Sequence, residues 1–147
     1  MSIECVCQAS LKASPQAGFA VLADVGRWPE WARDLERVVV HPHGPDGGPL
    51  RVTVVVEIFG EEFDGTVEIV PDPVNHAITF GLTECEHLQG MSGVLRFDPV
   101  GSGSRLDVKL SGTLTQPRGS RVDRLLSRRI ETALTRDLVR YIERGRR

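Results

Sequence analysis

Long apolar runs, cysteine and lysine are all scarce in this chain of 147 residues. No apolar run approaches the roughly 20 residues that a membrane-spanning helix requires. The first residues, MSIECVCQAS, lack the basic and apolar regions of a signal peptide. Three cysteines, an odd number, indicate reduced thiols. We therefore expect a cytoplasmic protein without a transmembrane segment.

The composition is that of one ordinary globular domain covering residues 1–147. Hydrophobic residues make up 40% of the chain and charged residues 26%. These values exclude a collagen, a coiled coil or a disordered tail as a description of the whole chain. At this length the chain can bury about two-thirds of its unfolded surface, which is enough for a genuine core.

Positive charge is concentrated at the end of the chain. Residues 117–147 contain ten arginines and four acidic residues, a net charge of +6, whereas the preceding residues carry −8. Lysine occurs only at Lys12 and Lys109. Such an asymmetry is typical of a solvated helix face, and it also fits a surface for an anionic partner.

Alternating apolar and polar residues predict seven strands. In residues 105–114, Leu106, Val108 and Leu110 share one face, as in an antiparallel sheet with one buried side. Connections between strands are too short for helical crossovers, so the predicted topology is a meander. The expected strands cover residues 3–9, 35–42, 50–59, 62–71, 76–84, 90–98 and 105–114.

Two short helices are expected after the first strand, and one long helix at the end. Ser14 and Pro15 form a favourable helix start, and Pro29 suits the first turn of a second helix. Residues 120–144 have an amphipathic pattern with arginines on the polar side. The apolar stripe must lie on the sheet; it consists of Leu126, Ile130, Ala133, Leu134, Leu138 and Tyr141.

The stretch from Ser14 to Trp31, SPQAGFAVLADVGRWPEW, resembles the opening of polyketide cyclase/dehydrase-like proteins. These proteins belong to the START-related helix-grip superfamily, which also holds the birch-pollen allergen. The resemblance implies an α+β helix-grip fold, in which a curved seven-stranded antiparallel sheet wraps around a long C-terminal helix, with two short helices after the first strand. It also implies an apolar cavity between the sheet and this helix.

A cavity of this kind suits a lipophilic ligand. Gly65, Gly93 and Gly112 lie on strands that face it, where a missing side chain either leaves room for a ligand or marks a bulge. The residues expected to line the cavity are Phe63, Phe80, Met91, Leu95, Phe97, Leu110, Leu126, Ile130 and Leu134.

Asp137 is the one acidic residue within the apolar stripe of the long helix, and Tyr141 stands one turn later. A carboxylate in such a place needs a partner or a raised pKa. Asp137 and Tyr141 are therefore the candidate catalytic residues, as acid–base groups within the cavity. The alternative is a salt bridge between Asp137 and a strand arginine such as Arg96.

No metal site or cofactor is expected. His41 and His43 share a strand face, but two ligands are too few for a metal site. Cys5 and Cys7 are expected as small core residues, and Trp28 and Trp31 as packing residues.

Three functions remain open. The first is binding of a lipid, polyketide-like molecule or aromatic metabolite. The second is catalysis as a polyketide cyclase, aromatase or dehydratase. The third is an interaction module that uses the arginine-rich face of the last helix. No specific nucleic acid is expected, because aromatic stacking residues do not accompany the arginines. A homodimer is left open.

Overall fold

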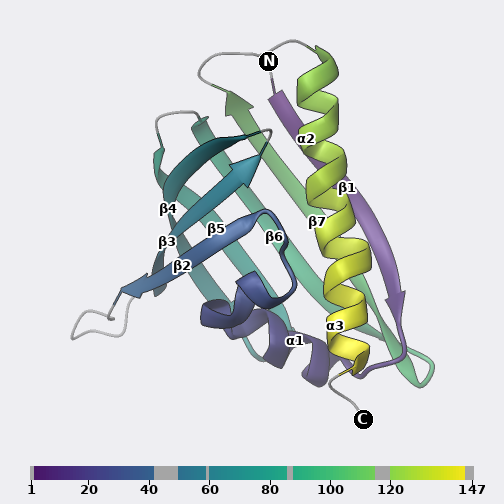
Figure 1. The fold of residues 1–147 in the computed structure, drawn as a ribbon. Coiled ribbons are helices and arrows are strands. Elements are labelled where there is room, and N and C mark those ends of the chain that lie inside the picture. Colours follow the sequence, from purple (N-terminus) through teal and green to yellow (C-terminus); the bar gives the residue numbers. More distant parts are fainter. Residues whose placement is uncertain (1, 42–49, 59, 86–87, 115–119, 145–147) are drawn as a thin grey trace.

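The computed structural model describes residues 2–41, 50–58, 60–85, 88–114 and 120–144, and shows one curved antiparallel sheet of seven strands (Figure 1). Neighbouring strands follow the order β1-β7-β6-β5-β4-β3-β2. Six consecutive strands therefore form the predicted meander, and the first strand pairs with the last. The strands are β1 (Ser2–Leu11), β2 (Leu35–His41), β3 (Leu50–Ile58), β4 (Glu61–Asp72), β5 (Ala77–Cys85), β6 (Leu88–Val100) and β7 (Gly103–Leu114).

The two short helices follow β1 as predicted. Helix α1 (Pro15–Ala23) begins with Ser14, whose hydroxyl accepts a hydrogen bond from the amide of Ala17 at 3.2 Å. The second, η1 (Val25–Glu30), is a 3-10 helix. Helix α1 packs on β5, β6 and β7 and so closes one end of the sheet.

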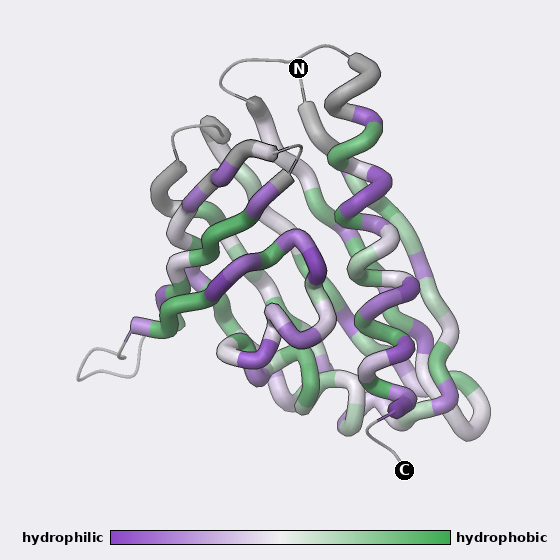
Figure 2. Tube along the Cα trace, viewed as in Figure 1, coloured by the Kyte–Doolittle hydropathy of each residue, from purple (hydrophilic) through white to green (hydrophobic). Residues whose placement is uncertain are grey.

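The C-terminal helix consists of α2 (Ser120–Thr132), a π-helical turn η2 (Ala133–Asp137) and α3 (Leu138–Arg144). It runs along β1, and hydrophobic and hydrophilic residues alternate along it (Figures 1 and 2). The sequence did not predict the π-turn, which adds about one residue to a helical turn. Ile142, absent from the predicted stripe, is buried together with Leu138, which lies four residues earlier on the same face of α3.

Sheet and helices together form the predicted α+β helix-grip fold. Register shifts occur between Leu35 and Arg37, between Thr66 and Val67, and between Leu88 and Gly90. Such bulges increase the local bend of a strand, and the sheet that they interrupt curves around the C-terminal helix.

Two of the three glycines expected to leave room for a ligand or mark a bulge have a packing role instead. A Cβ atom at Gly93 would lie 2.6 Å from Cδ2 of Leu110. A Cβ atom at Gly112 would lie 3.0 Å from the carbonyl oxygen of Gly90. The interpretation as free space is therefore wrong at these positions, because neighbouring atoms already fill it. Gly65 pairs with Val54 in the sheet, one residue before a bulge.

Candidate functional site

Apolar side chains on the inner face of the sheet form two sets along the strands. At the end closed by α1 they are buried, and Phe97 and Leu106 expose 1% and 0% of their surface. Towards the other end some remain buried, such as Val67 and Leu110, but a second set is only half-buried, although it packs against the same core. We call this second set the α2-end apolar group; it consists of Val54, Phe80, Leu82 and Met91 from the sheet, with Ile130 and Leu134 from the C-terminal helix.

The residues predicted to line a cavity occur in both sets. Leu95, Phe97 and Leu110 are buried in the core. Phe80, Met91, Ile130 and Leu134 belong to the α2-end apolar group, and Leu126 is half-buried on α2. The side chain of Phe63 lies outside the described residues, although its backbone pairs with Val56. Contact of these residues with a ligand stays a prediction.

Asp137 forms an ion pair with its neighbour Arg136, not with Arg96. Nε of Arg136 lies 3.3 Å from Oδ1 of Asp137, whose side chain is 11% exposed. Nε of Arg96 instead lies 2.9 Å from Oδ1 of Asp98 within β6. The predicted salt bridge to Arg96 is therefore wrong, because alternation along β6 directs Arg96 away from the buried Leu95 and Phe97.

Tyr141 has a different partner from Asp137. Its hydroxyl donates a hydrogen bond to Oε1 of Glu30 at 2.9 Å. This bond to a carboxylate raises the pKa of the Tyr141 phenol, because it stabilises the protonated form. Tyr141 is thus a hydrogen-bond donor that links α3 to η1, and the catalytic role of both residues stays a prediction.

A second link joins the C-terminal helix to the chain before β2. Arg129 donates two hydrogen bonds to the Asp34 carboxylate, with distances of 2.6 and 3.0 Å. The hydrogen bond raises the pKa of the Arg129 guanidinium still further above neutrality. Sequence reasoning missed this pair, because nothing in the helix pattern distinguishes Arg129 from the arginines beside it.

The two tryptophans pack edge to face, with ring centroids 6.4 Å apart. Nε1 of Trp28 donates a hydrogen bond to the carbonyl oxygen of Leu22 at 2.9 Å. Trp31 is buried in the core, and within the described residues its Nε1 has no hydrogen-bond acceptor. The predicted packing role is confirmed for both rings, and among the described residues the polar atom of Trp28 is paired while that of Trp31 is not.

Cys5 and Cys7 lie in the core and beside it, as expected. Their Sγ atoms are 3.5 Å apart. Burial raises the pKa of Cys5, and it raises that of Cys7 to about 12, so both thiols are protonated at neutral pH. These cysteines are therefore poor nucleophiles.

Neither a metal centre nor a membrane-spanning helix occurs among the described residues. No three of their histidine, cysteine or carboxylate side chains are placed to hold a metal ion. Nε2 of His41 lies 2.7 Å from Oγ1 of Thr53, while His43 lies outside the described residues. None of the described helices is both long and apolar enough to cross a bilayer.

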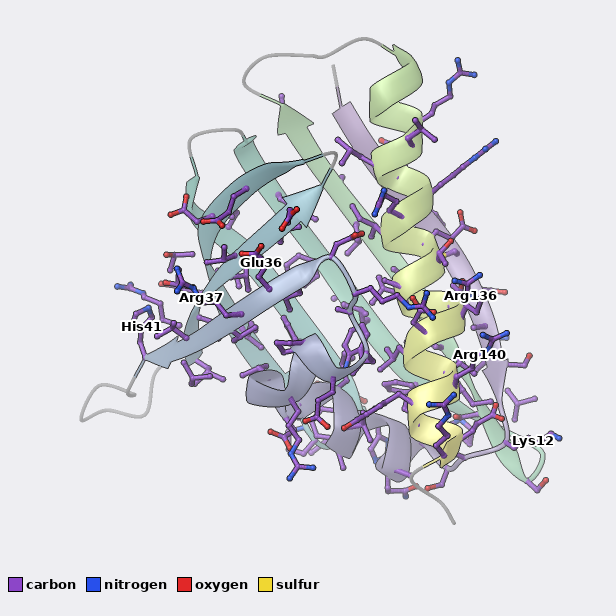
Figure 3. All side chains as sticks on the ribbon, in the orientation of Figure 1. Lys12, Glu36, Arg37, His41, Arg136 and Arg140 are labelled. Carbon is purple, nitrogen blue, oxygen red and sulfur yellow. The ribbon has the colours of Figure 1, made fainter. Side chains whose placement is uncertain are left out.

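The arginine-rich face lies on the outer side of the C-terminal helix. Arg136 and Arg140 point away from β2, whereas Glu36 and Arg37 lie on that strand (Figure 3). Arg129 and Arg136 of this helix already form ion pairs within the chain. An interaction through this face stays a prediction.

Comparison with known proteins identifies the family of this chain and solved structures with the same fold. The family model described as polyketide cyclase/dehydrase and lipid transport matches residues 11–143. No curated protein sequence matches the chain.

Solved structures share the fold at low sequence identity. A protein from Thermus thermophilus has a TM-score of 0.85 at 20% identity, covering 97% of this chain and 98% of that one. The Zhui aromatase/cyclase from Streptomyces sp. R1128 has a TM-score of 0.84 at 19% identity, covering 100% and 97%. A START superfamily protein from Mycobacterium smegmatis has a TM-score of 0.83 at 20% identity, covering 97% and 98%.

Proposed function

Since the chain belongs to the polyketide cyclase/dehydrase and lipid transport family, we propose that it binds a lipophilic small molecule between the sheet and the C-terminal helix. The bound molecule would be a lipid, a polyketide-like compound or an aromatic metabolite. It would lie against the α2-end apolar group.

The observation that carries this proposal is the incomplete burial of that group. Its members are apolar and face the interior side of the sheet, yet they are half-buried, while neighbours such as Leu95 and Ile78 are buried. Removing apolar surface from water stabilises by about 25 cal/mol per Å². An apolar ligand that covers these side chains would gain this stabilisation, and few polar contacts would be needed.

The test compares two positions on β6 that lie on opposite faces. Met91 belongs to the α2-end apolar group, whereas Val94 is exposed on the outer face. We expect cis-parinaric acid, a fluorescent fatty acid, to bind the wild-type protein in a fluorescence titration. Met91→Gln should weaken binding roughly tenfold, because it places an amide against the ligand. Val94→Gln should leave binding unchanged. Absence of binding, or equal effects of the two substitutions, would contradict the proposal.

The second candidate function is an enzyme that cyclises, aromatises or dehydrates a polyketide-like substrate. The observation that favours it is the low exposure of the Asp137 side chain in a chain whose fold is shared with an aromatase/cyclase. In this case Asp137→Asn should abolish turnover of a poly-β-ketone while circular dichroism shows intact folding. If the protein only binds ligand, the same substitution should leave binding of cis-parinaric acid nearly unchanged.

A further inference from the structure

The two tryptophans differ in the state of their indole N–H groups. Trp28 donates its N–H to the carbonyl of Leu22, and this bond holds the ring within the chain. Trp31 is 7% exposed, and its Nε1 is inaccessible to water and without an acceptor in the part of the chain that the structure describes. Buried N–H groups without a partner are rare, because such a group has lost its hydrogen bond to water. The unpaired donor of Trp31 therefore needs a physical explanation.

Two contacts of the neighbouring residues locate Trp31 beside the C-terminal helix. Glu30 accepts the hydrogen bond of Tyr141, and Asp34 accepts the two hydrogen bonds of Arg129. Residues 30–34 therefore run alongside the helix between residues 129 and 141. This stretch of helix contains Ile130 and Leu134, the helical members of the α2-end apolar group, and both pack against the core to which Trp31 belongs.

We propose that Nε1 of Trp31 donates a hydrogen bond to an oxygen atom of the bound molecule. The inference rests on the proposed function and narrows the ligand class to a lipophile that carries an acceptor, such as a ketone. Apolar side chains select a ligand by shape and size, whereas an indole N–H is a donor only and selects an acceptor. The side chains that cover Nε1 of Trp31 must move before a ligand can reach it. The hydrogen bond that Nε1 then donates to the ligand offsets the free-energy cost of this movement.

Two probes of nearly equal shape test the proposal. 2-Acetylnaphthalene carries a carbonyl oxygen where 2-isopropenylnaphthalene carries a methylene group. Affinities for both are measured by isothermal titration with the wild-type protein, Trp31→Phe and Trp28→Phe. Either substitution can weaken packing, so the informative quantity is the affinity ratio of ketone to alkene. This ratio should fall about fivefold in Trp31→Phe and stay unchanged in Trp28→Phe, whose indole is already paired.

A second measurement on the intact chain does not depend on the folding of Trp31→Phe. With ¹⁵N-labelled tryptophan, the protein gives two indole signals, which Trp28→Phe assigns. The indole proton of Trp31 should move downfield with the ketone and not with the alkene. Binding of both probes without this difference would overturn the role of Trp31 and leave the proposed function standing. If neither probe binds while cis-parinaric acid does, this inference fails and the proposed function stands; if cis-parinaric acid fails to bind as well, both are overturned.

Discussion

Arg129 and Asp34, which are 95 residues apart in the chain, are joined by two parallel hydrogen bonds between guanidinium and carboxylate. The bond between Tyr141 and Glu30 is a second link between the same two segments. Helix α2 therefore connects to the start of β2 on one side, while it packs on β1 on the other. None of its described side chains, residues 124–132, is buried. The Arg129–Asp34 link thus matters more for α2 than the Tyr141–Glu30 link does for α3, which has buried residues of its own.

Breaking the Arg129–Asp34 pair should loosen α2 more than it destabilises the whole fold. Asp34→Asn should lower the free energy of unfolding by about 1 kcal/mol or less, because both side chains are partly exposed to water. Amide hydrogen exchange should accelerate in α2 and not in α3. The control is Glu68→Gln, which removes the surface pair with Arg51. Equal acceleration in α2 and α3, or the same effect in the control, would contradict this view.

Two leucines one helical turn apart should differ in their contribution to stability. Leu138 is fully buried in α3, whereas Leu134 is half-buried in the π-turn. Leu138→Ala should lower the free energy of unfolding by about 2–5 kcal/mol, since it leaves a cavity in the core. Leu134→Ala should cost about 1 kcal/mol, because its side chain is already partly in water. Urea denaturation measures both. Equal losses would mean that Leu134 is as well packed as Leu138.

Much of the fold could be predicted because it depends on local patterns. Alternation in β7 and the Ser14–Pro15 helix start act over a few residues, and the structure confirms both. The π-turn could not be predicted, since a straight 3.6-residue periodicity fits the sequence of the helix equally well. Ile142, which the predicted stripe omits, is buried on the same face of α3 as Leu138.

The candidate site was less predictable, because its features depend on residues far apart in the chain. Arg129 pairs with Asp34, and Tyr141 pairs with Glu30. Both pairs form because η1 and the residues just before β2 lie beside the C-terminal helix. Likewise, the sequence predicts the same packing role for Trp28 and for Trp31. Only the folded chain shows that one indole has an acceptor and that the other has none among the described residues.

Close packing between α1 and β6 makes Gly18 a sensitive position. A Cβ atom there would lie 2.6 Å from Cε1 of Phe97, a contact that only a shift of the buried ring could relieve. Gly18→Ala should destabilise by about 1–3 kcal/mol, although alanine favours helix. Gly26→Ala is the matched control, because a Cβ atom at Gly26 would have no described atom within 4 Å. Phe97→Leu should lower the free energy of unfolding less in the Gly18→Ala protein than in the wild type. Additive effects would show that the two residues do not clash.

Glu36, at the bulge of β2, should make stability depend on pH. Hydrogen bonds with Glu57 and Glu62 raise the pKa of Glu36 from its ordinary value of 4.5 to about 7. Because the folded-state pKa is the higher one, protonation of Glu36 favours the folded state. Its contribution is fully present below about pH 4.5 and is lost as the pH rises through about 7.

Glu36→Gln keeps a neutral side chain at every pH, so its advantage over the wild type should appear only as Glu36 ionises. Urea denaturation at pH 4.5, 6 and 8 should give nearly equal free energies at the lowest pH and an increasingly more stable variant above it. The three side chains are exposed, so 0.5 M NaCl should reduce the difference. Glu68→Gln, which loses a partner in Arg51, should not gain stability at pH 8. A pH-independent difference for Glu36→Gln would show that the three glutamates do not repel one another in the folded state.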